Sequence, residues 1–216
     1  MSKRRKNFIP AFRFDWLTPL FDPFLRLTMR ESTFKHSLVK EASFQENNRV
    51  LDLGCGTGTL AILIRQAWPS AEVIGIDADE QILQIARSKI RNAGLNITLD
   101  KGMAPNLPYA DESFDLVVSS LFFHHLTREN KTLTLNEVYR ILRPTGHLLL
   151  ADFGQPDNIM MHLVSLVMRN FEEAADNYKG LLPKMIRDAG FVQVQTVAQY
   201  STLFGTLCLY KGYKPI

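Results

Sequence analysis

Residues 50–60 read VLDLGCGTGTL, an apolar run that ends in Asp52 and is followed by three glycines at every second position. A glycine-rich turn between an apolar strand and a helix is where open α/β sheets bind ligands, outside the carboxyl ends of the strands. At 216 residues the chain is long enough for one such domain with a large core. The residues around this turn therefore indicate both the fold and the ligand.

After residue 49, apolar runs alternate with helical patterns, which predicts βα units and a mostly parallel sheet. A helix is expected after each of the first two strands, and another over 130–142. Asp79 is placed to cap the second of these helices, and Gly94 to end it. The expected strands are 49–54, 72–77, 97–100, 114–120, 146–153, 192–200 and 203–213.

Two segments fall outside this alternation. Residues 1–47 are expected to form an N-terminal tail and a helical cover. The domain proper then spans 48–216, with a helical insertion at about 155–182. The strongly apolar residues 159–168 in this insertion are too few to span a bilayer.

The charge of the chain is concentrated at one end. Residues 3–6, KRRK, contribute four positive charges to a net charge of +3, so the rest is nearly neutral, which argues against a nucleic-acid-binding face. Cys55 and Cys208 are the only cysteines, and no signal peptide is recognisable, so we expect a cytoplasmic protein. Weak peripheral membrane contact through the basic N-terminus is an alternative that remains open.

Three ligands compete for the glycine turn. A P-loop needs Lys and then Ser or Thr after its last glycine, but Thr59 and Leu60 follow Gly58. The dinucleotide fingerprint needs a glycine where Thr59 stands. Asp52 would repel phosphates and attract an ammonium group, and Asp77, about 20 residues after the glycines, is placed to accept both ribose hydroxyls. S-adenosylmethionine carries both an ammonium group and a ribose.

Four ordered motifs carry a resemblance to a known family: VLDLGCGTG (50–58), VIGIDAD (73–79), LPYADESFDLVVSSLFFHHL (107–126) and LRPTGHLLLADF (142–153). They resemble the successive motifs of class I S-adenosylmethionine-dependent methyltransferases. The resemblance implies a Rossmann-like, seven-stranded, mostly parallel sheet of order 3-2-1-4-5-7-6, with the last strand antiparallel and helices on both faces. The ending TLCLYKGYKP (206–215) is similar to that of the ubiquinone/menaquinone-biosynthesis (type 11) small-molecule methyltransferases.

The resemblance implies a binding site for S-adenosylmethionine, which leaves as S-adenosylhomocysteine. Backbone amides of Cys55 and Thr57 are expected beside the methionine portion, Asp77 and Ala78 at the ribose, and Ile82 against adenine. The implied cofactor residues are Asp52, Gly54, Cys55, Gly56, Thr57, Gly58, Asp77, Ala78, Ile82, Met103, Ala104, Ser120 and Leu121.

Two positions depart from the relatives. Met103 stands where many of them place an acidic or amide residue against the adenine amino group, so recognition there falls to the backbone around Met103 and Ala104. His124 and His125 stand where the quinone-pathway enzymes often have an Arg-Asn pair. A histidine can remove a proton from an acceptor near neutral pH, so both are candidate catalytic residues.

The sequence therefore predicts a methyltransferase that acts on a small, apolar or quinone-like phenolic acceptor and needs no metal. The alternative is a non-catalytic protein that binds the cofactor as a sensor or structural ligand. Candidates to cover the acceptor pocket are the helix expected at 159–171 and four aromatic residues for each of which core packing is the favoured interpretation, namely Trp16, Phe21, Phe24 and Phe34.

Overall fold

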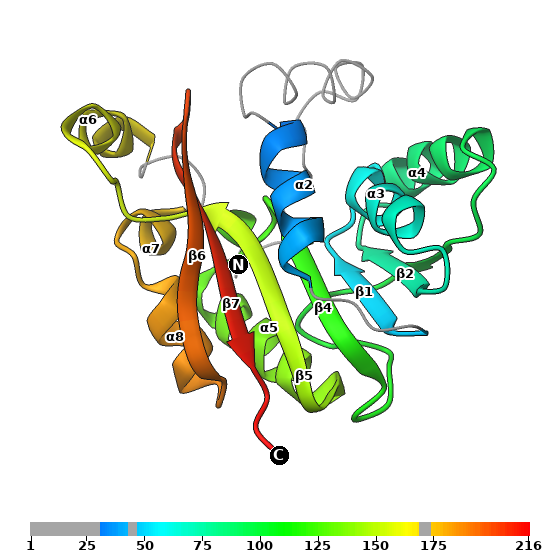
Figure 1. Cartoon of the computed structure of the whole chain (residues 1–216). Helices are drawn as coiled ribbons and strands as arrows, with labels where there is room; N and C mark the ends of the chain where they lie inside the picture. The colour runs from blue at the N-terminus through cyan, green and yellow to red at the C-terminus, as the bar shows by residue number, and fades with distance from the viewer. Residues whose placement is uncertain (1–30, 43–46, 169–173) are drawn as a thin grey trace, which may run out of the picture.

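The computed structural model describes residues 31–42, 47–168 and 174–216. Its strands are β1 (Arg49–Leu53), β2 (Glu72–Asp77), β3 (Thr98–Lys101), β4 (Phe114–Ser120), β5 (Leu142–Phe153), β6 (Val192–Thr202) and β7 (Gly205–Tyr213). They form one sheet in the order β3-β2-β1-β4-β5-β7-β6, in which β7 runs antiparallel to both neighbours (Figure 1). The other neighbouring pairs are parallel. The Rossmann-like sheet implied by the resemblance is confirmed.

The described helices agree with the alternating pattern. They are α2 (Glu31–Glu41), α3 (Thr59–Ala67), α4 (Glu80–Asn92), the short 3-10 helix η2 (Phe123–His125), α5 (Arg128–Ile141), α6 (Ile159–Met168), α7 (Ala175–Tyr178) and α8 (Leu182–Asp188). Asp79 caps α4 as expected, because its side chain accepts hydrogen bonds from the amides of Gln81 and Ile82.

Two elements differ from the sequence-based expectation. Strand β5 begins four residues early, and Pro144 is tolerated there because the pairing with β4 shifts register between Phe114 and Leu116. Helix α8 was not expected, because its seven residues are too few to show a clear period. It buries Leu182 and Ile186.

Helices cover both faces of the sheet (Figure 1). Alternate residues of β1 show the division: Val50 belongs to a hydrophobic cluster with residues of α2 and α3, whereas Leu51 and Leu53 belong to a second cluster with residues of α5 and α8. Phe34 of α2 is 1% exposed and belongs to the first of these clusters, so it is a core residue and not a pocket cover. Trp16, Phe21 and Phe24 lie outside the described residues.

The C-terminus of α2 is held by two basic side chains of the sheet. Lys211 Nζ donates to the Glu41 carbonyl at 2.9 Å, and His147 Nε2 lies 3.0 Å from the Ala42 carbonyl. Burial, reinforced by nearby Lys211, lowers the pKa of His147 to about 4. His147 is therefore neutral at physiological pH and donates its Nε2 proton to the helix end.

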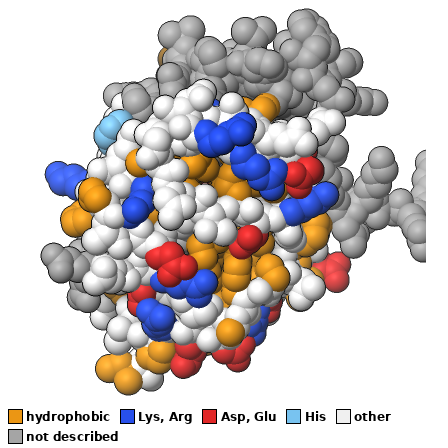
Figure 2. All heavy atoms as spheres, turned by 90° about the vertical axis from the view of Figure 1, so that its right-hand side faces the viewer, with side chains coloured by type: hydrophobic (Ala, Val, Ile, Leu, Met, Phe, Trp, Pro, Cys, Tyr) orange, Lys and Arg blue, Asp and Glu red, His pale blue; other side chains and the backbone are white. Residues whose placement is uncertain are grey.

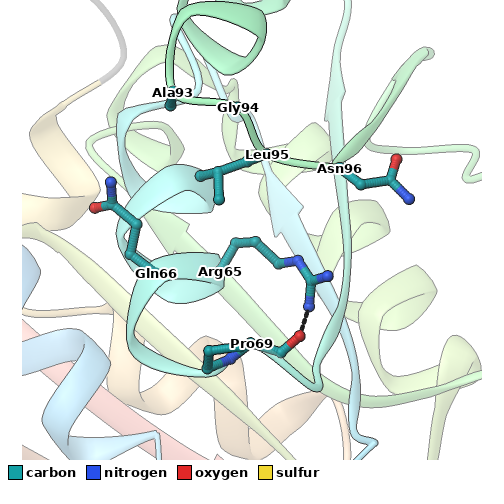
Figure 3. Close-up of a pocket in the computed structure, with 7 residues that line it drawn as sticks. All are labelled: Arg65, Gln66, Pro69, Ala93, Gly94, Leu95 and Asn96. Atoms are coloured by element: carbon teal, nitrogen blue, oxygen red, sulfur yellow. Dashed lines mark hydrogen bonds between the residues drawn. The ribbon is translucent and has the colours of Figure 1, made fainter.

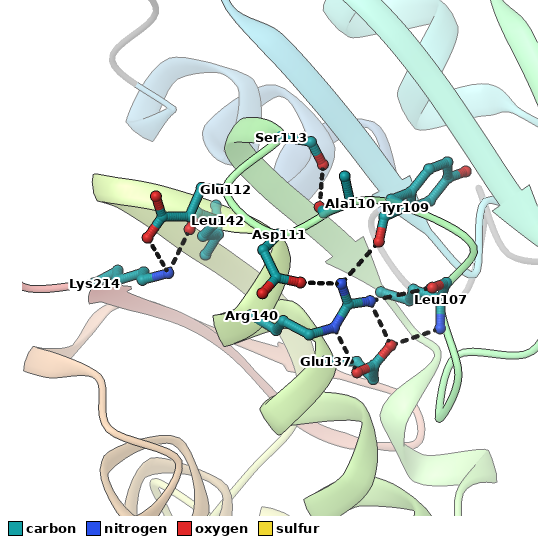
Figure 4. Close-up of polar contacts among 10 residues, drawn as sticks. All are labelled: Leu107, Tyr109, Ala110, Asp111, Glu112, Ser113, Glu137, Arg140, Leu142 and Lys214. Atoms are coloured by element: carbon teal, nitrogen blue, oxygen red, sulfur yellow. Dashed lines mark hydrogen bonds and ion pairs between the residues drawn. The ribbon is translucent and has the colours of Figure 1, made fainter.

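An arginine of α5 holds the loop between β3 and β4. Arg140 donates to the carbonyls of Leu107 and Tyr109 and pairs with Asp111 and Glu137, as Figure 4 shows. Glu137 in turn accepts from the Leu107 amide at 2.8 Å. This network fixes a loop that begins at the carboxyl edge of the sheet, where the ligand site is expected.

The first glycine of the turn after β1 is packed against a residue that follows β4. Gly54 has φ +68°, and a Cβ placed there would lie 2.4 Å from Cγ of Phe122. Gly56 has φ +53°, yet a Cβ there would meet no described atom within 4 Å. Glycine is thus required by packing at the first position, whereas the second opens into free space.

We expect Gly54→Ala to be more destabilising than Gly56→Ala. Both variants place a side chain at positive φ, at a cost of about 1–2 kcal/mol, but only the first overpacks against Phe122, at about 1–3 kcal/mol more. Urea unfolding of the single variants and of Gly54→Ala/Phe122→Ala measures the difference. Equal losses at the two glycines, or no coupling between Gly54 and Phe122, would contradict this packing.

His147 should make stability depend on pH. Between about pH 6.5 and 4 the unfolded chain binds a proton at this histidine and the folded chain does not, so stability falls as pH falls through this window, by on the order of 1 kcal/mol per unit. His147→Gln keeps an N–H donor and removes the titration. The gap between wild-type and variant unfolding free energies, measured from pH 7.5 to 4.5, should change accordingly. Parallel curves would show that His147 is not buried in its neutral form.

Candidate cofactor site

Asp52 is a buried carboxylate on β1 with one unused oxygen. Its side chain is 1% exposed, and Oδ2 accepts from the amide of Ala61, in the first turn of α3, at 3.0 Å. Oδ1 is buried without a hydrogen-bond partner. Burial raises the pKa of Asp52 to about 7, against the opposing effects of Lys35 and the Ala61 amide. An ammonium group would supply the partner that Oδ1 lacks.

Asp77 lies at the end of β2, on the same face of the sheet as Asp52. Asp52 pairs in register with Gly75, two residues before Asp77, and the charge of Asp77 adds to the rise in the pKa of Asp52. Asp77 Oδ2 accepts from the Gly56 amide and Oδ1 from the Asp79 amide, each at 3.0 Å. Burial is the main cause of its raised pKa. A carboxylate oriented in this way retains lone pairs for two hydroxyl groups.

The glycine turn is tied to the end of β2. The amides of Gly54 and Cys55 both donate to the Ile76 carbonyl, at 2.9 and 3.0 Å. The Cys55 amide, which we expected to face the ligand, therefore maintains the turn instead. Burial raises the pKa of the Cys55 thiol, which suits a small packing residue and not a nucleophile. Thr57 Oγ1 accepts from Lys89 Nζ at 3.1 Å.

The other expected cofactor residues lie at the end of the glycine turn, after β2 and after β3. A Cβ at Gly58 would lie 3.2 Å from Ala86, so this glycine brings α3 and α4 together. Ala78 directly follows Asp77 and is half-buried, and Ile82 is 8% exposed on α4. Met103 and Ala104 follow Gly102, whose amide donates to the Asp77 carbonyl at 3.0 Å, which places them at the edge where Asp77 lies. Met103 is 39% exposed and Ala104 is buried.

Strand β4 ends in a sharp turn. Ser120 is half-buried and pairs with Ala151, and Leu121 then adopts φ +54°, a conformation that is strained for a branched side chain. The Leu121 amide donates to the Ala151 carbonyl at 2.8 Å. The turn directs the following residues, through Phe122, back over the ends of β4 and β5.

This turn brings His124 onto a buried carboxylate of β5. His124 Nδ1 lies 2.9 Å from Asp152 Oδ1, and the His124 amide donates to Asp152 Oδ2 at 3.2 Å. The His125 ring packs against the His124 ring, with centroids 4.0 Å apart. Sequence reasoning missed Asp152, although its position as an acid at the end of an apolar strand repeats the signal that identified Asp52 and Asp77. Phe122 carried no comparable signal.

The geometry around Asp52, Asp77 and Gly56 fits S-adenosylmethionine. It provides an unpartnered buried oxygen for the ammonium group, a carboxylate for the ribose and open space beside the turn. Within residues 31–42, 47–168 and 174–216, no group of three or more His, Cys, Asp or Glu side chains could hold a metal ion. None of the helices described there is long and apolar enough to cross a membrane.

A second hollow lies on the opposite edge of the sheet. A hollow lined by Arg65, Gln66, Pro69 and residues 93–96 lies before the first residues of β2 and β3, at the edge of the sheet opposite the glycine turn (Figure 3). Arg65 already donates to carbonyls there, including that of Pro69. Figure 2 shows that the face carrying α3 and α4 mixes basic, acidic and apolar side chains.

Comparison with known proteins shows which family the chain is similar to. The family described as "Methyltransferase domain" matches residues 50–146. The chain is 30% identical to the ubiquinone/menaquinone biosynthesis C-methyltransferase UbiE of Pectobacterium carotovorum, over 84% of this chain and 80% of that protein. It is 34% identical to the demethylmenaquinone methyltransferase of Lactobacillus johnsonii, over 77% of this chain and 66% of that protein.

Solved structures show the same fold. A S-adenosylmethionine-dependent methyltransferase of Methanosarcina mazei has a TM-score of 0.69 at 22% identity, over 82% of this chain and 97% of the other. The YcgJ protein of Bacillus subtilis has a TM-score of 0.66 at 20% identity, over 84% and 99%. The curated relatives give no support to a non-catalytic cofactor-binding protein. The chain belongs to the class I S-adenosylmethionine-dependent methyltransferases, and within them it is most like the ubiquinone/menaquinone-biosynthesis type.

Proposed function

We propose that this methyltransferase acts on a small, apolar, hydroxylated aromatic acceptor of the quinone-precursor type. The observation that carries the proposal is the set of residues at the ends of β4 and β5, where histidines lie among aromatic rings. The ring of Phe153 lies 5.0 Å from that of His124 and stacks on that of Tyr178 at 5.4 Å. The names of the two curated relatives, which both refer to quinones, support the same class of acceptor.

The cofactor site is proposed to work through charge and close backbone approach. Asp52 holds the ammonium group, Asp77 the ribose hydroxyls, and Gly56 leaves room for the methionine portion, while Ile82 and Met103 flank the adenine. When bound, S-adenosylmethionine supplies an activated methyl group on its sulfonium sulfur. The protein's task is then to align the acceptor and to exclude water, which converts an encounter into an effectively intramolecular step.

The molecule that receives the methyl group needs a side chain of the protein that takes up its proton. A phenolic hydroxyl is a weak nucleophile until its proton is removed, and His124 and His125 are the candidates to remove it.

Both cysteines of the chain are buried free thiols, which supports a proposed location in the reducing cytoplasm.

Cofactor affinity should depend on the ionisation of Asp52. Because burial raises its pKa to about 7, we expect the affinity for S-adenosylmethionine and S-adenosylhomocysteine to fall by up to about tenfold per unit below pH 7. Calorimetric titration at pH 8, 7 and 6 measures this. The control ligand 5′-methylthioadenosine lacks the ammonium group and should not show the effect. Asp52→Asn should bind more weakly at pH 8 and lose the dependence. The same slope for methylthioadenosine would exclude this role of Asp52.

The acceptor class is tested by methyl transfer. Purified enzyme with methyl-labelled cofactor is incubated with benzoquinols and naphthoquinols bearing apolar side chains, and separately with glycine, a peptide mixture and RNA. We expect label in the quinols only. Asp77→Ala should reduce transfer at least about 100-fold, because two charge-assisted hydrogen bonds to the ribose are lost. Label in peptide or RNA would refute the proposed acceptor, and cofactor binding without any transfer would favour a non-catalytic role.

A further inference from the structure

Asp152 is a fully buried carboxylate that the cofactor site does not use. It is 0% exposed at the end of β5, and Oδ1 accepts from the Phe153 amide at 2.7 Å. Burial alone would raise the pKa of Asp152, but the charge and hydrogen bonds of His124 bring it below its ordinary value. A buried carboxylate kept ionised in this way is unfavourable unless partners compensate its charge, so its position needs an explanation.

We propose that Asp152 is a positioning residue that makes His124, and not His125, the proton acceptor for the methylated substrate. This inference rests on the proposed function. It names which histidine acts and which residue orients it.

The carboxylate determines where the imidazole of His124 carries its proton. An ionised carboxylate only accepts hydrogen bonds, so the 2.9 Å contact between His124 Nδ1 and Asp152 Oδ1 places the proton on Nδ1. The lone pair of the neutral ring then lies on Nε2. Asp152 acts on His125 through charge, whereas it is hydrogen-bonded to His124. The two histidines are therefore not equivalent.

The backbone supports the same assignment. Ser120 pairs with Ala151, so residue 124 would continue away from residue 152 if β4 remained extended. The left-handed Leu121 and the turn of η2 reverse the chain, and the His124 amide reaches Asp152 Oδ2 at 3.2 Å. Phe153 then meets the imidazole edge to face, at 5.0 Å and 70°. Backbone, carboxylate and aromatic ring together restrict the orientation of His124.

The titratable side chains of the neighbouring strand β7 add no charge beside Asp152 and His124. Tyr210 and Cys208 of β7 face Asp152, and burial raises the pKa of both, so they remain neutral near pH 7. Gly154 leaves room for Cys208, since a Cβ at residue 154 would lie 2.3 Å from Cys208 Sγ. The negative charge of Asp152 thus remains to stabilise an imidazolium at His124.

The proton transfer balances without an additional reactant. The proton of the acceptor hydroxyl moves to His124 Nε2, and the O–H bonding pair stays on the acceptor, which becomes the nucleophile. His124 carries the positive charge next to Asp152 and later returns the proton to solvent. Asp152 itself remains ionised throughout, as in other carboxylate-oriented histidines.

Histidine tautomers provide a test that does not need the acceptor. Long-range ¹H–¹⁵N spectra of histidine-labelled protein near pH 8, assigned with His124→Asn, should show His124 with its proton on Nδ1. In Asp152→Asn the amide can donate to Nδ1, so the proton should move to Nε2. Asp115→Asn removes a carboxylate at the opposite end of β4 and should leave the His124 signals unchanged. A wild-type proton on Nε2, or an unchanged tautomer in Asp152→Asn, overturns the proposal. If Asp152→Asn does not fold, the wild-type spectrum alone decides.

Turnover provides the second measurement. With an accepted quinol, Asp152→Asn and His124→Asn should each lower kcat on the order of 10²–10⁴-fold, with cofactor affinity unchanged. The double variant should lose no more than either single variant, because the two residues act as a unit. Asp115→Asn should retain wild-type turnover. A larger loss in His125→Gln than in His124→Asn, or additive losses, overturns the proposal. If no quinol is methylated, the proposed acceptor fails, while the tautomer still reports on Asp152.

Discussion

This molecule depends on one constraint, which is that the carboxylate of Asp52 must be held in a buried position. Asp52 lies on a central strand with one oxygen on the first turn of α3 and the other without a partner. Such an arrangement is unfavourable in the protein alone, because burial disfavours the charged form. The tight turn through Gly54 and Gly58 starts α3 directly after β1, and this brings the Ala61 amide onto the carboxylate. The carboxylate that we propose for the cofactor's ammonium group is thus part of the first βα unit.

The other functional groups reach the same edge because the strands are parallel. Residues at the carboxyl ends of neighbouring parallel strands lie side by side, so Asp77, Ser120 and Asp152 gather although they are far apart in sequence. Each strand end contributes one polar group and then turns sharply away. The Arg140 network fixes the loop that leads from this edge to the start of β4, and Lys211 and His147 hold the C-terminus of α2 against the sheet. Rigid elements therefore position side chains whose chemistry depends on small distances.

The sequence predicted the sheet and led to the proposed cofactor residues because both depend on short-range patterns. The apolar runs, the glycine spacing and the capping Asp79 are local signals, and the strand order followed from the resemblance that the motifs carry. The contact between Phe122 and Gly54 could not be predicted, since it depends on how β4 packs beside β1. Phe34, considered for the acceptor pocket, proved to be core, because an aromatic side chain on a short helix suits either place. The start of β5 at Leu142 was missed because a register shift made Pro144 acceptable.

The acceptor half of the site depends on long-range register, and this explains why Asp152 was missed. Nothing near HHL in the sequence indicates its partner, which lies 28 residues further along on another strand. Only the pairing of Ser120 with Ala151, followed by the reversal at Leu121, brings the two side chains together. Where quinone-pathway relatives often have Arg-Asn, this chain has two histidines, of which His124 is hydrogen-bonded to a buried carboxylate. The cofactor half can therefore stay constant while one turn and one strand end change the chemistry offered to the acceptor.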